Sequence, residues 1–152
     1  MPESINNLFA IRIPDGWSDD TVYTIMGPED NGIKHNLVIT VDSEINTKEM
    51  SLRDAAFLRI ESLKENLPGL EILNETEKIL PQSERTVYEV VYKFVQNESK
   101  PVFQKQVYLI EDKKLYSFAA SFSKKTIKTI GTVVDEMIDT FTPFTVKQVN
   151  FD

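Results

Sequence analysis

Alternating apolar and polar positions dominate the second half of the chain. Three runs, residues 86–95, 102–110 and 115–122, are rich in β-branched and aromatic side chains, and short turn-forming segments separate them. Such runs are typical of strands, and their close succession predicts an antiparallel meander. Because side chains alternate between the two faces of a strand, the pattern also predicts which residues share a face.

The alternation predicts one apolar face and one mixed face for this meander. In the middle strand the apolar side carries Phe103, Val107 and Leu109. Its other side carries Val102, Gln104, Gln106, Tyr108 and Ile110. In the third strand, Tyr116, Phe118, Ala120 and Phe122 oppose Leu115, Ser117, Ala119 and Ser121. The mixed face is the feature of the chain that most resembles a binding surface.

The first half of the chain predicts further strands. Residues 8–13 form a short apolar run that ends at a Pro-Asp-Gly-Trp turn, where Trp17 is expected to plug one end of the core. Residues 21–26 and 35–41 predict two more strands, and residues 70–73 and 78–80 predict a weaker strand pair. A mixed face recurs here, made of Val22, Thr24, Asn36, Val38 and Thr40.

Two segments have helical periodicity. Ser51 and Asp54 predict a capping box, and Pro68-Gly69 ends the first helix. Its apolar stripe is Leu52, Ala56, Ile60, Leu63 and Leu67. Ser123 is expected to cap the second helix, whose stripe is Ile127, Ile130, Val134, Met137, Ile138 and Phe141 and which Pro143 stops.

Runs of adjacent strands separated by single helices favour an α+β fold. We expect one antiparallel, twisted sheet with both helices packed on one face, which leaves the opposite face as an open, concave groove. The whole chain, 1–152, is predicted to be a single domain with a core from about residue 8 to 144 and a polar tail at 145–152.

Charge and composition exclude several classes of protein. Acidic residues outnumber basic ones 24 to 17, and the net charge is -7. The imbalance is local: residues 1–50 hold nine acids and three bases, whereas residues 101–152 hold six acids and seven bases. With no basic stripe along the sequence, the chain is not expected to bind nucleic acid or anionic lipid, and solubility explains the acidic balance.

The sequence holds no cysteine, no apolar run long enough to span a membrane, and no secretory leader after Met1. We therefore expect a cytoplasmic protein without stable membrane insertion. The single histidine, His35, stands at a strand start, where a surface or turn role is expected. No catalytic, metal-binding or cofactor-binding motif is found, so the sequence predicts no enzyme, no metal and no cofactor.

Three motifs together resemble the DcrB-like family. They are Phe9-Ala-Ile-Arg-Ile-Pro-Asp-Gly-Trp17, Asn66-Leu-Pro-Gly-Leu70, and Gln104-Lys-Gln-Val-Tyr-Leu109 ahead of a Leu-Tyr-Ser-Phe strand. The resemblance extends from about residue 8 to 141 and implies a PsbP-like sandwich, which agrees with the predicted order of strands and helices.

Without a leader, the chain resembles the branch that includes the Eag-type chaperones of type VI secretion. The resemblance implies a cytosolic adaptor, in many members a homodimer. Its concave sheet would shield the hydrophobic N-terminal transmembrane helices of an effector before loading onto the secretion spike. The expected client-binding residues are Val22, Thr24, Val38, Thr40, Arg59, Gln104, Gln106, Tyr108, Ser117 and Ala119. Gln106 stands where this branch carries a glutamine, whereas Arg59 stands where many members have glutamine.

Other interpretations of the sequence stay open. The mixed face is equally typical of an antiparallel sheet with one solvated side. The chain is alternatively a DcrB-like protein of another role, which binds a small ligand in a pocket under Trp17 or binds a protein partner. A periplasmic homologue that has lost its leader is a third possibility, against which Met1 argues.

Overall fold

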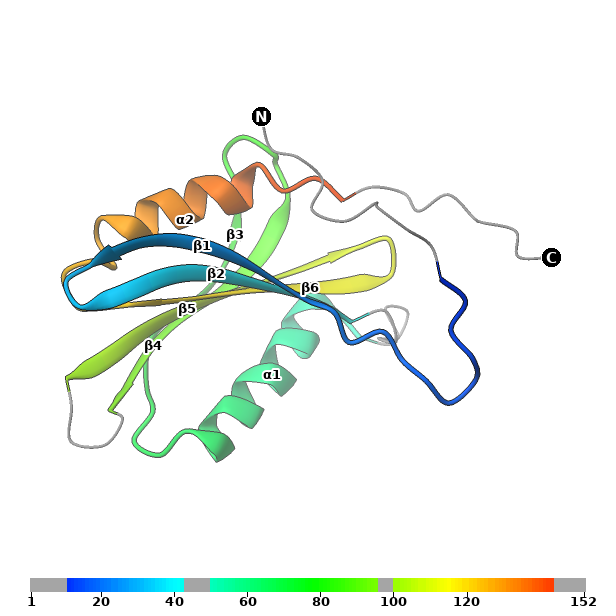
Figure 1. Cartoon of the computed structure of the whole chain (residues 1–152), viewed down its shortest axis with the longest axis horizontal. Helices are drawn as coiled ribbons and strands as arrows, with labels where there is room; N and C mark the ends of the chain where they lie inside the picture. The colour runs from blue at the N-terminus through cyan, green and yellow to red at the C-terminus, as the bar shows by residue number, and fades with distance from the viewer. Residues whose placement is uncertain (1–10, 43–49, 96–99, 144–152) are drawn as a thin grey trace.

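The structure, a computed structural model, describes residues 11–42, 50–95 and 100–143. Six strands form one antiparallel sheet in the order β1-β2-β6-β5-β4-β3 (Figure 1). The strands are β1 (Val22–Asp30), β2 (Ile33–Asp42), β3 (Glu71–Ile79), β4 (Thr86–Val95), β5 (Pro101–Glu111) and β6 (Lys114–Phe122). The helices are α1 (Leu52–Asn66) and α2 (Ile130–Asp139). The α+β class and the antiparallel sheet are therefore confirmed.

The predicted meander corresponds to β4, β5 and β6. Asp112 and Lys113 join β5 to β6 with φ angles of 51° and 63°, the left-handed conformation that a two-residue hairpin turn requires. In the register between these strands, Gln106 lies opposite Ala119 and Tyr108 lies opposite Ser117. The division of β5 and β6 into an apolar and a mixed face is confirmed. The apolar-face residues pack in one buried cluster, whereas the mixed-face residues pack in a second cluster or are half-buried.

The capping box of α1 is present as the sequence predicts. The backbone N–H of Asp54 donates to Ser51 Oγ over 3.2 Å, and the backbone N–H of Ser51 donates to Asp54 Oδ2 over 3.3 Å. At the other end Gly69 takes a φ of 73° and turns the chain toward β3. The helix buries Ala55, Ala56 and Ile60, and these small or branched side chains allow it to lie close to the sheet.

The second helix begins later than the sequence predicts. Ser123 Oγ accepts from the backbone N–H of Thr126, and Thr126 Oγ1 accepts from the backbone N–H of Ser123. This reciprocal pair completes a turn, so residues 124–129 are turns and α2 starts at Ile130. The backbone hydrogen bonds of this segment differ in span: the Ile127 N–H donates to the Ser123 carbonyl, whereas the N–H groups of Thr129 and Gly131 both donate to the Thr126 carbonyl. The regular α-helical pattern therefore does not extend back to Ser123.

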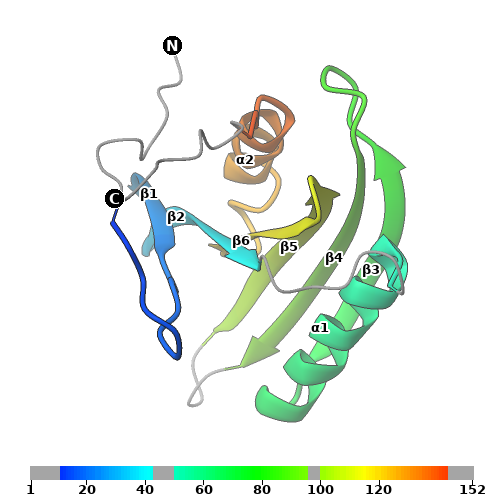
Figure 2. The ribbon, with the colours of Figure 1, turned by 90° about the vertical axis from the view of Figure 1, so that its right-hand side faces the viewer.

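The two helices pack on opposite faces of the sheet, so the prediction that both lie on one face is wrong (Figure 2). α2 covers a cluster formed by Leu37, Ile39, Leu80, Val87, Phe103, Val107, Leu109, Tyr116, Phe118, Ala120, Phe122, Val134 and Ile138. α1 covers a cluster formed by Ala55, Ala56, Ile60, Val90, Tyr92, Phe94, Tyr108 and Leu115. The mixed face receives a helix because β4 supplies it with apolar and aromatic side chains.

Two strands differ from the prediction in extent. The two runs predicted as a weaker strand pair belong to a single strand, β3. Its pairing register with β4 shifts between Ile72 and Asn74, which accounts for the interrupted alternation of apolar and polar residues. β1 continues past Gly27-Pro28 to Asp30 through a similar irregularity. The chain turns only at Asn31 and Gly32, with φ angles of 53° and 80°.

The N-terminal segment also differs from the prediction. Residues 11–13 are not a strand, whereas residues 8–10 and the expected polar tail at 145–152 lie outside the described residues. The Pro-Asp-Gly-Trp turn is closed by a 3.2 Å hydrogen bond from the Trp17 backbone N–H to the Pro14 carbonyl. Its indole is 76% exposed, so Trp17 does not plug the core. The clusters on both faces are filled by the sheet and its helices instead.

Candidate functional site

The face of the sheet that carries α1 is covered over only part of its width. α1 packs on β4 and β5, while β1, β2 and β6 extend beyond it (Figure 2). Six predicted client-binding residues lie on this extension, and we call them the open half-face: Val22, Thr24, Val38, Thr40, Ser117 and Ala119. Val22 is 53% exposed, Thr24 is exposed, and the other four are half-buried.

The strand register places the open half-face in two neighbouring rows. Val22 pairs with Thr40, Thr40 with Ser117, and Ser117 with Tyr108. In the next row Thr24 pairs with Val38, Val38 with Ala119, and Ala119 with Gln106. Paired residues in an antiparallel sheet share a face and lie side by side. The structure therefore brings eight of the ten predicted residues into one continuous block.

Beside this block, β4, β5 and β6 carry a chain of side-chain hydrogen bonds that we call the tyrosine–glutamine chain. Tyr108 Oη donates to Gln106 Oε1 over 2.6 Å, and Gln106 Nε2 donates to Tyr92 Oη over 2.9 Å. Tyr92 Oη in turn donates to Gln104 Oε1, and Gln104 Nε2 donates to Ser121 Oγ over 2.8 Å. Five side chains are thereby held in one orientation.

The two phenols of this chain are buried beneath α1. Tyr92 is 0% exposed and Tyr108 is 1% exposed, so the expectation that Tyr108 faces a client is wrong. Burial raises the pKa of Tyr108 well above its usual value, the nearby Tyr92 adds to the rise, and Arg59 opposes it. Burial also raises the pKa of Tyr92. Both phenols therefore stay protonated hydrogen-bond donors around neutral pH, and they orient the glutamines.

The glutamine amides keep hydrogen-bonding capacity beyond this chain. A primary amide has two N–H donors and an oxygen with two acceptor positions. Gln104 and Gln106 each use one N–H and one oxygen position on neighbouring side chains within the described residues. Both side chains are half-buried at the edge of the open half-face. Each one can therefore donate a further hydrogen bond to a group placed on that surface.

Arg59 lies at the margin of the block, on α1. Its guanidinium Nη2 is 2.7 Å from Asp42 Oδ2 at the end of β2, and the two side chains are 47% and 39% exposed. This ion pair joins α1 to the strand that carries Val38 and Thr40. Arg59 is therefore placed beside the expected surface, with its charge engaged by the sheet.

His35 is buried, so the expected surface or turn role is wrong. It is 3% exposed, and its ring lies 6.0 Å from the ring of Phe122 between centroids. Nδ1 lies 2.9 Å from the Pro28 carbonyl and Nε2 lies 2.9 Å from Thr126 Oγ1. The imidazole thus ties the β1–β2 hairpin to the turn before α2. The alternation of β2 could have indicated this burial, because His35 is in phase with Leu37 and Ile39.

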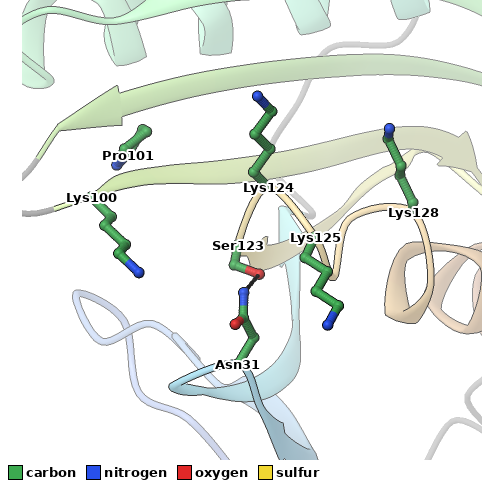
Figure 3. Close-up of a pocket in the computed structure, with 7 residues that line it drawn as sticks. All are labelled: Asn31, Lys100, Pro101, Ser123, Lys124, Lys125 and Lys128. Atoms are coloured by element: carbon green, nitrogen blue, oxygen red, sulfur yellow. Dashed lines mark hydrogen bonds between the residues drawn. The ribbon is translucent and has the colours of Figure 1, made fainter.

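The structure also forms a pocket that the sequence pattern did not reveal, which we call the lysine pocket. Its volume is about 520 Å³, and its lining residues are Asn31, Lys100, Pro101, Ser123, Lys124, Lys125 and Lys128 (Figure 3). Asn31 Nδ2 donates to Ser123 Oγ over 2.8 Å across it. Three of the lysines are close in sequence, but only the fold adds Lys100 and the β1–β2 turn to them.

The described ranges contain neither a metal-binding cluster nor a membrane-spanning helix. Across residues 11–42, 50–95 and 100–143, no three His, Cys, Asp or Glu side chains gather in a way that could hold a metal ion. Neither helix in those ranges has the length and apolar character needed to cross a membrane.

Two solved structures of bacterial proteins are similar to this fold. PA94 from Pseudomonas aeruginosa, a protein of unknown function, has a TM-score of 0.70 at 16% identity, covering 88% of this chain and 90% of that one. Cyanobacterial PsbP from Synechocystis has a TM-score of 0.51 at 12% identity, covering 81% and 82%. These likenesses establish a PsbP-like fold. A search of curated proteins found no significant match.

The sequence comparison identifies the family. The DcrB family profile matches residues 10–140, which includes all six strands and both helices of the described structure. The matched region contains the open half-face and the tyrosine–glutamine chain. The chain therefore belongs to the DcrB family.

Proposed function

We propose that this protein is a non-enzymatic chaperone or adaptor that holds a hydrophobic N-terminal helix of a type VI secretion effector against the open half-face. The observation that supports it most is the tyrosine–glutamine chain, which presents oriented amides beside a block of small and apolar side chains. Membership of the DcrB family and the resemblance to Eag-type chaperones agree with this role.

The composition of the open half-face suits a transmembrane helix held in water. Val22 and Val38 offer apolar area, which stabilises a complex by about 25 cal/mol for each Å² buried. Ser117 and Ala119 are small and half-buried, so a helix backbone could approach β6 closely. Contacts of this kind resemble the packing between helices inside a bilayer.

The glutamines would supply the polar part of the same interaction. A membrane helix that packs through small residues also presents hydroxyl, amide or carbonyl groups, and these need hydrogen-bond partners when water is excluded. Gln106 is held by Tyr108 and Tyr92, so its second N–H can be offered without the loss of side-chain freedom that a mobile glutamine would undergo.

The Arg59–Asp42 ion pair limits where the client would lie. Because the guanidinium is engaged by Asp42, Arg59 contributes in this proposal by holding α1 against β2. The client helix would then lie over β1, β2 and β6, alongside α1. The homodimer that the resemblance implies stays a prediction, which light scattering of the purified protein would test.

The test is co-expression with the hydrophobic N-terminal region of a candidate effector, followed by a pull-down. Gln106→Glu places a carboxylate in the tyrosine–glutamine chain and should abolish soluble capture, because a charge beside an apolar helix is costly to desolvate. Gln82→Glu makes the same chemical change at an exposed position in the β3–β4 turn and should capture the client like the wild type.

Circular dichroism must show that both variants are folded. Equal capture by Gln106→Glu and wild type would exclude the proposed surface. Failure of the folded wild type to capture any of several such regions would exclude the proposed function and favour an ordinary solvated sheet face.

A further inference from the structure

Positive charge gathers at the lysine pocket although the protein as a whole is acidic. The net charge is -7, yet Lys100, Lys124, Lys125 and Lys128 all line this one pocket (Figure 3). Lys100 comes from the segment before β5, and the other three come from the turns between β6 and α2. Because β5 and β6 are neighbours in the sheet, the start of one strand lies beside the end of the other.

These four lysines share one pocket, and none of them is paired with a carboxylate in the described part of the chain. Lys64, Lys78, Lys93 and Lys105 each form an ion pair with a carboxylate. All four pocket lysines are exposed. Like charges gathered without a counter-charge repel one another. An anion in the pocket would relieve that repulsion.

The base of the pocket is held by hydrogen bonds. Asn31 donates to Ser123, the Ser123 and Thr126 side chains cap each other's backbone, and Thr126 Oγ1 lies 2.9 Å from the buried His35 ring. These contacts fix the β1–β2 turn against the turns that carry Lys124, Lys125 and Lys128. The turns that carry Lys124, Lys125 and Lys128 are therefore held in place, and the Ser123 hydroxyl and the Asn31 amide line the same pocket (Figure 3).

No carboxylate is among the described residues that line the pocket. The nearest acidic residues along the same hairpin are Glu29 and Asp30, at the end of β1, and neither is a lining residue. The volume of about 520 Å³ is in the range of ligand-binding pockets. Lysine binds phosphate as a compact point charge on a flexible stem, so separated lysines suit an anion whose charges are themselves separated.

We infer that the lysine pocket binds an anion with two or more clustered phosphate groups, either a free oligophosphate or the phosphorylated headgroup of a lipid. A single phosphate would gain little, because each exposed ion pair is weak. Several phosphates can engage several lysines at once. This site lies at the end of β6 and before β5, and the inference does not depend on the function proposed for the open half-face.

The test is titration of the full-length protein with inorganic tripolyphosphate, followed by calorimetry and by amide chemical shifts. Shifts should concentrate at Asn31, Ser123 and the pocket lysines, and affinity should fall as salt is added. Lys124→Gln/Lys128→Gln should weaken binding about tenfold. The control is Lys113→Gln/Lys114→Gln, which removes the same charge at the β5–β6 hairpin, the opposite end of these strands, and should leave the affinity unchanged.

A second arm distinguishes the two sources of phosphate. Co-sedimentation with phosphatidylcholine vesicles that contain a phosphoinositide, compared with phosphatidylcholine alone, reports binding to a lipid headgroup. Lysine-dependent binding of tripolyphosphate without co-sedimentation would assign the pocket to free oligophosphates. Absence of both, or equal loss of binding in the pocket and control variants, would overturn the inference.

Discussion

The two faces of the sheet use polar groups in opposite ways. On the face that carries α2, the charged groups form ion pairs: Glu89 Oε2 lies 2.6 Å from Lys78 Nζ, and Lys105 Nζ lies 2.9 Å from Asp135 on α2. On the face that carries α1, ion pairs between the helix and the sheet occur only at the margins of the helix, Arg53 with Glu77 and Arg59 with Asp42, among the described residues. The central polar groups there are neutral phenols, amides and hydroxyls in the tyrosine–glutamine chain. The first arrangement closes the face onto its own helix, whereas the second leaves hydrogen-bonding capacity at an uncovered surface.

The part of each sheet face that its helix covers explains much of this contrast. The cluster under α2 draws on β2, β4, β5 and β6, while the cluster under α1 draws mainly on β4 and β5. Alternation along a strand gives both faces the same length, but one helix can cover only part of the width of a six-stranded sheet. On the face that α2 covers, the side chains of β1, β2 and β6 are therefore mostly apolar. On the opposite face, where no helix covers these strands, polar and apolar side chains are mixed.

The largest expected effect is on the α2 face. Phe118→Ala removes an aromatic ring that is 1% exposed, and it should lower the free energy of unfolding by about 4 kcal/mol. Ser117→Ala, one residue earlier on the other face, should change it by less than about 1 kcal/mol. Urea unfolding followed by circular dichroism measures both variants. Similar losses in the two variants would contradict the assignment of the faces.

A smaller effect is expected in the tyrosine–glutamine chain. Tyr92→Phe removes the hydroxyl that accepts from Gln106 and donates to Gln104, and it should cost about 1–2 kcal/mol. Tyr88→Phe is the control, because the Tyr88 hydroxyl makes no hydrogen bond within the described residues. If Tyr92→Phe were no more costly than Tyr88→Phe in the same unfolding experiment, the chain would not hold the glutamines in place.

Alkaline pH should lower the free energy of unfolding, because the phenols buried on the α1 face resist ionisation in the folded protein. Burial raises the pKa of Tyr108 above the ordinary 10.0, so the unfolded protein loses this proton first as the pH rises. Stability should be insensitive to this group below pH 10.0 and should then fall by about 1 kcal/mol per pH unit. Tyr108→Phe should show a shallower fall in urea unfolding across this range, and an identical slope would refute the burial of the phenol.

The smallest effect is expected at the margin between α1 and the open half-face. Arg59→Gln removes the ion pair with Asp42, whose side chains are 47% and 39% exposed, so the loss should be about 0.5 kcal/mol. High salt should reduce the difference between variant and wild type, because solvent ions screen exposed charges. A loss of several kcal/mol that salt does not change would show that Arg59 has a role in packing instead.

Much of the local structure could be predicted because it depends on neighbours in sequence. The period of two in residues 102–110 and 115–122 assigned β5 and β6 to their faces, and Ser51 and Asp54 indicated the start of α1. Alternation also placed the expected residues of each strand on one face, but eight of the ten form one block only because β2 pairs with β6, far away in the chain. The burial of Tyr108 could not be predicted this way, because it depends on where α1 lies.

The sequence by itself determined the α+β class, the strands of the meander, the composition of each strand face and the capping of α1. Only the tertiary structure decided that the helices lie on opposite faces, that His35 is buried, and that Lys100 joins Lys124, Lys125 and Lys128 around one pocket. Periodicity and capping are set by interactions within a few residues. The faces that helices cover and the pockets that loops form depend on contacts between segments far apart in the chain, and no local pattern encodes them.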